Sequence, residues 1–363
     1  MKLIDIIAGA RPNFMKIAPI IRELDSRMSG GGYLRYRLVH TGQHYDARMS
    51  GDFFAQLGIP DPHVNLEVGS GSQAEQTATI MIRYEKLLKE KRSDLCLVVG
   101  DVTSTMACAI ASQKLGVPVA HVEGGIRSGD WSMPEEINRL VTDAITNYFF
   151  TTSEVANANL LKAGVPAEQI YFVGNTMIDT LLGNMNRFQP PLFWSDLKLA
   201  TGNYFVLTLH RPANVDEPKS FFDLLQAIST ACRDMIIVFP AHPRTAGTLR
   251  LVGRLPSNIF LVDPQPYLEF NYLVKHAKAV ITDSGGITEE TTVMGVPCLT
   301  LRNTTERPET VNIGTNELLG TDPAAIKPAV DRLFAGEWKT GGIPKFWDGR
   351  TGARIVDVLE SLL

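Results

Sequence analysis

The chain has 363 residues, which is long against a usual domain of about 100 to 200 residues and favours two domains. Hydrophobic residues make up 44% and charged residues 20%, a composition that is typical of a packed globular protein and excludes disorder and collagen. Lys and Arg total 35 against 39 Asp and Glu, a net charge of −4, and no basic run offers a track for a phosphate backbone. No nucleic-acid partner is therefore expected.

The chain lacks the sequence patterns of membrane insertion, secretion and metal binding. No stretch approaches the roughly 18 uncharged apolar residues of a membrane-spanning helix, and the opening MKLIDIIAGARPNFMK becomes charged too early for a secretory signal, so a cytosolic protein is expected. The cysteines have no CxxC spacing and are expected to be reduced core residues: Cys96, Cys108, Cys232 and Cys298. The histidines show neither HxH nor HExxH spacing, so no metal site is predicted.

Short β-branched runs alternate with helix-length segments along the chain, the pattern of βαβ units that build parallel sheets covered by helices. In the first half, strands are expected within residues 2–8, 36–42, 95–101, 118–124 and 147–153. In the second half, strands are expected within residues 204–210, 235–242, 259–263, 279–286 and 297–302. The chain is expected to end in an amphipathic helix.

The two series predict an α/β protein with two Rossmann-like, doubly wound domains. The hinge is expected between about residues 172 and 200, around the Gln-Pro-Pro segment at 189–191. We assign residues 1–174, joined by the terminal helix 351–363, to the first domain and residues 175–350 to the second. Sheets of this kind bind ligands at the carboxyl ends of their strands, so a ligand cleft between the two domains is expected.

The end of the first strand has the features of an anion-binding turn. Gly9 permits a tight turn and Pro12 suits the first position of a helix, which places Arg11 and Lys16 near a positive helix end. Because the whole chain is net negative, an anionic ligand needs such local positive charge. The alternative is an ordinary loop with solvated side chains. The segment is not a GxGxxG fingerprint, so no nicotinamide cofactor is indicated.

Carboxylates follow the next strand ends. Asp101 comes directly after one strand, and Glu123 comes after the next, where two glycines clear space beside it. Glu135 and Glu136 open the following helix after Pro134. Helix capping is the alternative role for Asp101, and pairing with the helix dipole is the alternative for Glu135 or Glu136. If these groups converge, mutual repulsion raises the pKa of at least one of them, the condition for a general acid at neutral pH.

Polar residues also follow the strand ends of the second half. His210 is a titratable group beside a cation, with structural capping as its alternative role. Ser284, Gly285 and Gly286 open a helix, and the glycines let backbone N–H groups approach a diphosphate. The DSGG string also surrounds a protease nucleophile, but the α/β setting and the lack of a matching His and Asp argue against a serine protease.

Further residues of the second half are candidates for holding a nucleoside. Glu290, one turn into the same helix, is placed to accept ribose hydroxyls. Gln265, Tyr267 and Phe270 are candidates for amide pairing with a base and for stacking on it, with core packing as the alternative for the aromatic rings. Arg307 lies in a polar loop and is a candidate clamp for phosphate or ribose. The residues alone thus predict a nucleotide-sized anion as ligand.

Several motifs occur in a fixed order along nearly the whole chain: GARPNFMK, GDVTST, HVEGGIRSGDWSMPEEINR, TLHRPANVD, TDSGGITEE and TTERPE. Together they closely resemble the motifs of non-hydrolysing UDP-N-acetylglucosamine 2-epimerases. The resemblance implies a GT-B-like architecture and an isomerase that needs no cofactor, works commonly as a homodimer and serves cell-surface polysaccharide biosynthesis. It also implies a UDP-sugar substrate, with UDP-GlcNAc and UDP-ManNAc interconverted by elimination of UDP to 2-acetamidoglucal and re-addition.

The resemblance further implies roles for individual residues. The implied catalytic residues are Asp101, Glu123, Glu135 and His210. The implied UDP-sugar contacts are Arg11, Lys16, Gln265, Phe270, Ser284, Gly285, Gly286, Glu290 and Arg307. Inversion at C2 needs proton transfer on both faces of the sugar ring. We expect Asp101 and Glu123 to be the proton-transfer pair, with Glu135 assisting and His210 near the diphosphate.

This chain departs from the family at a site where a second substrate molecule activates some members. Those members carry Gln at the place of Asp46 and Arg near position 70, where this chain reads Gly-Ser-Gly-Ser. Gln43, Arg211 and His242 do match. We therefore expect that the activating site is not intact.

The sequence leaves other outcomes open. A hydrolysing 2-epimerase would release free ManNAc, and an epimerase of a modified UDP-hexosamine would use the same motifs. A GT-B glycosyltransferase and a non-catalytic UDP-sugar sensor are further alternatives. The set of acidic residues Asp101, Glu123 and Glu135 argues against these last two.

Overall fold

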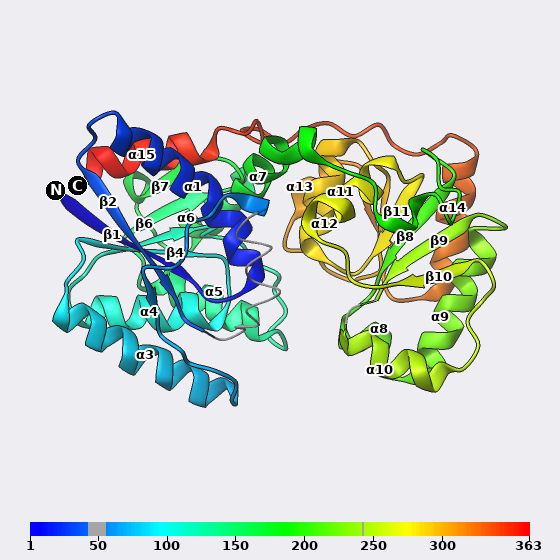
Figure 1. Ribbon diagram of the computed structural model, residues 1–363, viewed down its shortest axis with the longest axis horizontal. Helices are drawn as coiled ribbons and strands as arrows, with labels where there is room; N and C mark the ends of the chain where they lie inside the picture. The colour runs from blue at the N-terminus through cyan, green and yellow to red at the C-terminus, as the bar shows by residue number, and fades with distance from the viewer. Residues whose placement is uncertain (43–55, 242) are drawn as a thin grey trace. The chain divides into compact units, whose positions relative to one another are not determined.

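The computed structural model describes residues 1–42, 56–241 and 243–363. The chain divides into two compact units, the first formed by Met1–Gly183 and Lys345–Leu363 and the second by Asn184–Pro344. Each unit has a parallel sheet with helices on both faces (Figure 1). Each segment predicted as a strand overlaps one, so the α/β class and the two parallel sheets are confirmed.

The first unit is built on a doubly wound sheet. In their order across this sheet, its strands are β3 (Val64–Asn65), β2 (Leu34–His40), β1 (Lys2–Ala8), β4 (Leu95–Val99), β5 (Val119–Val122), β6 (Tyr148–Thr151) and β7 (Ile170–Phe172). Its helices include α1 (Arg11–Ser29), α3 (Gln73–Glu90), α4 (Thr103–Lys114), α5 (Pro134–Ala144), α6 (Glu154–Lys162), α7 (Thr176–Asn184) and α15 (Thr351–Leu362). The strand order reverses between β1 and β4, the switch point at which Rossmann-type sheets bind ligands.

Apolar helix faces cover both sides of this sheet. Helix α3 buries Ile80, Tyr84 and Leu88, which are four residues apart and share one face, against the cluster that includes strand β4. Helices α1 and α15 lie side by side on the opposite side of the sheet (Figure 1). Gly352 permits this packing, because a Cβ there would lie 2.7 Å from the carbonyl oxygen of Pro19.

The second unit repeats the same design. In their order across the sheet, its strands are β10 (Ile259–Val262), β9 (Ile236–Pro240), β8 (Tyr204–Thr208), β11 (Ala279–Thr282), β12 (Cys298–Thr300) and β13 (Asn316–Leu318). Its helices include α8 (Pro212–Val215), α9 (Pro218–Ala231), α10 (Pro243–Val252), α11 (Tyr267–His276), α12 (Gly285–Met294), α13 (Pro308–Asn312) and α14 (Ile326–Phe334). Here the order reverses between β8 and β11.

Strand β8 shows how the second sheet is buried on both faces. Phe205 and Leu207 belong to the core cluster that contains residues of α9 and α14. Tyr204 and Val206, which point to the other face, belong to the cluster that contains residues of α11. A strand with four consecutive apolar residues, Tyr204 to Leu207, therefore fits the centre of a parallel sheet between two helix layers.

The unit boundaries differ from those expected from the sequence. The first boundary was expected after residue 174 but falls after Gly183, because α7 packs with the first unit: Asp179 accepts a hydrogen bond from the backbone N–H of Gly352 at 2.7 Å. The return to the first unit was expected at residue 351 but comes earlier. Trp347 is buried and its indole N–H donates to a carbonyl of the first unit.

The four cysteines are buried and free, which confirms that they are reduced core residues. In the part of the chain that the structure describes, no helix has both the length and the apolar character to cross a bilayer. Over the same residues, no group of three or more His, Cys, Asp and Glu side chains is arranged to hold a metal ion. The cytosolic location stays a prediction.

Candidate active site

The candidate residues of the first unit lie at the carboxyl ends of β1, β4 and β5, around the switch point. Arg11 is the first residue of α1, which follows β1, and Lys16 lies in the second turn of that helix. Asp101 follows β4 and Glu123 follows β5. Glu135 is in the first turn of α5. Since neighbouring parallel strands end at the same edge of a sheet, this topology gathers the groups that the sequence places far apart.

Glu123 forms a buried ion pair with Lys16. The Lys16 Nζ lies 2.7 Å from the Glu123 Oε2, and the two side chains are 11% and 3% exposed. Glu123 has a φ of 73°, in the left-handed region that side chains other than glycine rarely adopt, and its backbone N–H donates to the Phe150 carbonyl. Gly100 leaves room for the ammonium group, because a Cβ there would lie 2.8 Å from Nζ. Lys16, expected at the diphosphate, thus contacts the candidate catalytic carboxylate.

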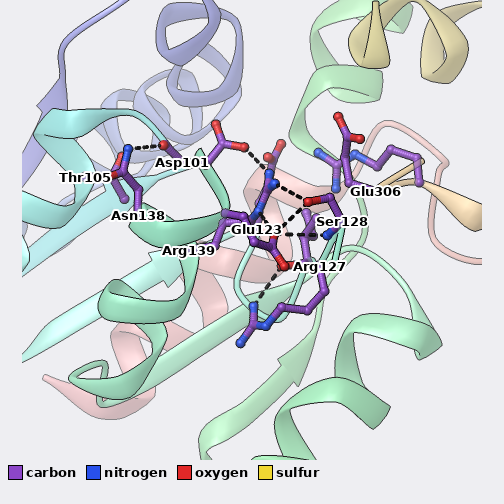
Figure 2. Close-up of polar contacts among 12 residues, drawn as sticks. Asp101, Thr105, Glu123, Arg127, Ser128, Asn138, Arg139 and Glu306 are labelled. Carbon is purple, nitrogen blue, oxygen red and sulfur yellow. Dashed lines mark hydrogen bonds and ion pairs between the residues drawn. The ribbon is translucent and has the colours of Figure 1, made fainter. Parts of the chain in front are cut away.

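Asp101 is held from two sides by helix α5 (Figure 2). Arg139 donates from Nη1 to the Asp101 Oδ2 at 2.5 Å, and Asn138 donates to the Asp101 carbonyl oxygen at 2.8 Å. Helix α4 begins at Thr103 with Val102 as its N-cap, so the capping role considered for Asp101 is wrong. Asp101 and Glu123 each face a cation rather than another carboxylate, which differs from the mutual repulsion expected from the sequence.

The two glutamates at the start of α5 have different environments. Glu136 is buried and accepts hydrogen bonds from the backbone N–H groups of Ser128 and Gly129 and from Arg139. Burial works to raise the pKa of the Glu136 carboxyl, but these hydrogen bonds and the Arg139 charge outweigh it, so the pKa lies below its ordinary value. Glu135 is exposed, one helical turn before Arg139 and on the same side of α5. Glu136 is therefore structural, and Glu135 is the one available to a ligand.

A buried His–Asp pair joins the two loops that carry Asp101 and Glu123. The Nδ1 of His121 lies 2.7 Å from Asp143 Oδ1, and its Nε2 lies 2.8 Å from the carbonyl oxygen of Gly100. Asp143 also accepts from the Gly125 backbone N–H at 3.0 Å and from Arg127 at 2.6 Å. Burial raises the pKa of the Asp143 carboxyl, but the partners His121 and Arg127 outweigh burial and hold the pKa below its usual range.

Sequence reasoning did not single out these supporting residues. The signals that could have found them are a polar residue inside an apolar strand, His121 in VAHV, and a buried acid on the core side of an amphipathic helix, Asp143 in α5. Arg139, which binds the Asp101 carboxylate, likewise has no sequence signal of its own beyond its place in a motif.

In the second unit, Asp283 organises the end of β8 from the neighbouring strand β11. This fully buried carboxylate accepts from the backbone N–H of Arg211 at 2.9 Å and from Asn214 at 3.0 Å, and it lies 3.0 Å from the Nδ1 of His210. Burial raises the pKa of Asp283, but the hydrogen bonds from His210, Asn214 and Arg211 outweigh it and lower the pKa overall. Because a carboxylate only accepts, the His210 Nδ1 carries the hydrogen in this contact.

The start of α12 has the features of an anion-binding helix terminus. Ser284 is its N-cap, and among the described residues its side chain makes no capping hydrogen bond, which leaves the first-turn N–H groups and the positive helix end without that partner. Position 285 favours glycine for a steric reason, because a Cβ there would lie 2.6 Å from the Oε1 of Glu306. At Gly286 the space is open. The structure thus brings Ser284, Gly285 and Gly286 together at one helix end, as expected.

Glu290 lies one turn further along α12 in a buried polar pocket. Asn271 donates toward its Oε1 at 3.5 Å, and the Tyr267 hydroxyl also hydrogen-bonds it. Burial raises the pKa of the Glu290 carboxyl to about 7, and these hydrogen bonds oppose the shift without cancelling it. Tyr267, considered for stacking on a base, is instead a buried partner of Glu290.

The remaining candidates of the second unit have separate environments. Gln265 donates to the Asp263 carbonyl at 2.7 Å and lines a cavity of about 1020 Å³. Phe270 is half-buried and packs against the core cluster on the α11 side of the sheet. Arg307 is buried and pairs through Nε with the Oε1 of Glu289 at 2.6 Å.

Comparison with known proteins decides the family. The model of the UDP-N-acetylglucosamine 2-epimerase family matches residues 27–360. The chain belongs to the UDP-N-acetylglucosamine 2-epimerase family. It is 40% identical over 372 residues to the UDP-N-acetylglucosamine 2-epimerase of Methanocaldococcus jannaschii, covering 99% of each chain. It is 36% identical over 366 residues to the UDP-2,3-diacetamido-2,3-dideoxy-D-glucuronate 2-epimerase of Pseudomonas aeruginosa, covering 100% of each.

Solved structures of 2-epimerases match over the full chain. The crystal structure of the Methanocaldococcus jannaschii UDP-GlcNAc 2-epimerase in complex with UDP-GlcNAc and UDP has a TM-score of 0.87 at 38% identity, covering 99% of this chain and 100% of that one. The family resemblance drawn from the motifs is confirmed, and so is the GT-B-like fold class with two Rossmann-like units.

The segment that departs from activated 2-epimerases has a structural role in this family member. Ser72, at the end of the Gly-Ser-Gly-Ser segment, is the N-cap of α3: its Oγ accepts from the Glu75 N–H at 3.3 Å, and the Glu75 carboxylate accepts from the Ser72 N–H at 2.9 Å. Arg211 donates from Nε to the Asp283 carbonyl at 3.0 Å. Gln43, Asp46 and His242 lie outside the described residues. The missing activating site stays a prediction.

The raised pKa of Glu290 predicts a pH-dependent stability in this 2-epimerase. The folded chain holds a proton on Glu290 up to a pKa of about 7, whereas the unfolded carboxyl releases it near 4.5. The folded state therefore loses stability as pH rises from 4.5 to 7 and does not regain it above 7, by a total of about 3 kcal/mol. We expect Glu290→Gln to unfold at a higher urea concentration than wild type at pH 8.5, with a difference that shrinks toward pH 5.

The control for this prediction is Glu168→Gln, which removes an exposed carboxylate of the first unit. The urea concentration at which this variant is half unfolded should change with pH in the same way as that of wild type. A Glu290→Gln variant whose stability gain is the same at pH 5 and pH 8.5 would show that ionisation of Glu290 is not the cause.

Proposed function

We propose that this chain catalyses the reversible C2 epimerisation of UDP-GlcNAc and UDP-ManNAc without hydrolysis. The observation that carries the proposal is the pair of carboxylates, Asp101 and Glu123, at neighbouring strand ends of the first switch point, each held by a buried cation. Full-length identity of 40% with a UDP-N-acetylglucosamine 2-epimerase supports the same reaction.

The chemistry explains why a carboxylate pair and an anion site are both needed. The C2–H bond has no adjacent carbonyl, so the C1–O bond to the diphosphate must weaken first. As UDP leaves, positive charge builds at C1 and acidifies C2–H. A base takes the C2 proton, the C–H electron pair forms the C1=C2 bond of 2-acetamidoglucal, and UDP keeps the electrons of the C1–O bond. In re-addition, a UDP oxygen attacks C1 and a proton is delivered to the other face of C2.

The first-unit carboxylates are proposed as the two proton-transfer groups. Lys16 pairs with Glu123 and Arg139 pairs with Asp101, so each carboxylate is held in place at its strand end for proton transfer to or from carbon. One carboxylate takes the C2 proton and later releases it to water, and the other, which has taken up a proton from water, delivers it to the opposite face of C2. Exposed Glu135, one turn from Arg139, is proposed to assist.

The second unit is proposed to hold the nucleotide and stabilise the leaving group. The N-terminus of α12, with Ser284, Gly285 and Gly286, is proposed to bind the diphosphate, and His210, oriented by Asp283, to stabilise its growing charge. Glu290 is proposed to bind the ribose. Gln265 and Phe270 are proposed for the base, and Arg11 and Arg307 for the phosphates.

Incubation with UDP-GlcNAc in D₂O, followed by ¹H NMR, tests this function. We expect UDP-ManNAc to appear and both epimers to carry deuterium at C2, because the glucal intermediate is reprotonated from exchanged carboxyls. Free ManNAc would identify a hydrolysing enzyme. Epimerisation with no deuterium in either epimer would refute elimination and re-addition.

A modified UDP-hexosamine is the second candidate substrate. It is favoured by the 36% identity, over the full length of both chains, to an enzyme named for a 2,3-diacetamido-2,3-dideoxy-glucuronate sugar. Measuring kcat/KM for that UDP-sugar and for UDP-GlcNAc separates the two. A ratio above about 10³ in favour of the modified sugar would reassign the natural substrate.

We also propose a homodimer formed through α3. Ala74, Ala78 and Met81 of α3 line a hollow of about 580 Å³ together with Met106 of α4 and residues of α5, and Ile82 of α3 is 65% exposed. An apolar hollow beside an exposed apolar side chain is typical of an interface between subunits. Sedimentation velocity should give twice the chain mass, and Ile82→Asp should shift the protein toward the monomer.

A further inference from the structure

The start of α12 already contacts a carboxylate of the chain itself. Glu306 lies in the loop before α13, and its Oε1 would be 2.6 Å from a Cβ placed on Gly285, the first residue of α12. The other oxygen, Oε2, accepts from the Nη2 of Arg302 at 2.6 Å. Arg211 Nη2 lies 3.9 Å from Oε1. A negatively charged group thus stands where the positive helix end favours an anion.

Arg302 has a second nitrogen at the same place. Its side chain is 5% exposed, and within the described residues nothing accepts a hydrogen bond from Nη1. This nitrogen lies 3.6 Å from the Cβ position of Gly285. A buried guanidinium N–H without an acceptor is costly, so an arginine in this state is suited to a further anionic oxygen. Sequence reasoning assigned no role to Arg302 or Glu306.

We propose that the Glu306 carboxylate and a phosphate group of the UDP-sugar compete for one anion position at the start of α12, and that Arg302 binds whichever of the two is there. The inference rests on the proposed function, because it takes the diphosphate to this helix end. It adds a phosphate-binding residue, Arg302, and an internal competitor, Glu306. The competitor weakens nucleotide binding and gives the Arg302 guanidinium a partner after UDP has left.

The charge of Glu306 makes this competition constant over the working pH range. Burial works to raise the pKa of its carboxyl, but the hydrogen bond and charge of Arg302 and the charge of Arg307 hold the pKa at about 2. Glu306 is thus ionised at any pH at which the enzyme is assayed. A phosphate that replaces it offers more oxygen acceptors and a larger charge, enough to bind Nη1 and Nη2 of Arg302 and the first-turn N–H groups together.

Calorimetric titration with UDP and with uridine tests the proposal. Glu306→Gln keeps the shape and one oxygen acceptor for Arg302 but removes the charge, so we expect it to bind UDP about tenfold more tightly than wild type. Its affinity for uridine should stay within about twofold, because uridine has no phosphate to compete. Arg302→Met should bind UDP about tenfold more weakly, again with unchanged affinity for uridine.

Glu317→Gln is the matched control, because Glu317 pairs with Arg332 in the same unit and its loss changes the net charge by the same amount. It should bind UDP like wild type. If Glu306→Gln melts at a markedly lower temperature than wild type, Glu306→Ala replaces it in the UDP titration. If wild type binds UDP but both Glu306 variants bind it no more tightly, the competition is disproved and the proposed function stands. If wild type does not bind UDP, the proposed function fails, and this inference fails with it.

Discussion

Glu123→Gln should lower kcat for epimerisation by about 10³-fold, within the range that general acid–base groups contribute. An amide of the same shape keeps a hydrogen-bond acceptor for the Lys16 ammonium, 2.7 Å from the native carboxylate, but it can neither take the proton from C2 nor return one. The loss belongs to the chemical step, so affinity for UDP, which is proposed to bind through the second unit, should remain within about threefold.

NMR in D₂O measures this effect directly, because epimerisation and deuterium entry at C2 should fall together. The control is Glu85→Gln, which changes a partly exposed glutamate of α3 that pairs with Lys89; this variant should react like wild type. A Glu123→Gln variant that retains more than about one tenth of wild-type kcat would remove Glu123 from the proton-transfer pair.

Asp143→Asn should lower the free energy of unfolding by about 3 to 5 kcal/mol, as expected when one member of a buried charged network is removed. Three donors converge on the carboxylate, from His121, Gly125 and Arg127. An asparagine has one oxygen and one NH₂ group, so its NH₂ must face a donor. The loops that carry Asp101 and Glu123 then shift, and because misplacement by about 1 Å can cost 100-fold, we expect kcat to fall by about that factor.

Urea unfolding and steady-state kinetics on the same preparation separate positioning from stability. Asp94→Asn is the control: Asp94 also accepts from a backbone N–H and a lysine, but it precedes β4 and so lies at the amino end of the same sheet. It should change kcat by less than about twofold. If Asp143→Asn is destabilised but has wild-type kcat where it is folded, the His–Asp pair holds the fold and does not position the carboxylates.

The long strands were predictable from the sequence, because apolar runs such as LCLVV are typical of strands buried on both faces in the middle of a sheet. It missed β3, β7 and β13, which have two or three residues and too little periodicity to recognise. Positions at strand ends were also predictable, since a doubly wound sheet gathers them at one edge. Their partners were not: Arg139 is 38 residues from Asp101, and only the neighbour relations of strands and helices bring them together.

In the second unit too, the positions of site residues are predictable from the sequence and their partners are not. The short string that opens α12 indicates an anion site by its residue types alone. That Glu306 would stand against Gly285 depends on the path of the loop between β12 and α13, which has no local sequence rule. The domain boundaries were displaced for a similar reason, because the side to which α7 packs is a tertiary property.

The second unit is one continuous stretch, 184–344, inserted into the first, whose last helix is made at the end of the chain. Helix α15 completes the first unit by packing on α1, where Arg27 pairs with Asp357 and Glu360. A translating ribosome therefore releases every strand of the second unit before it releases α15. Until α15 has emerged, the side of α1 that packs against it is uncovered, and a nascent chain paused at that stage would present this surface to chaperones.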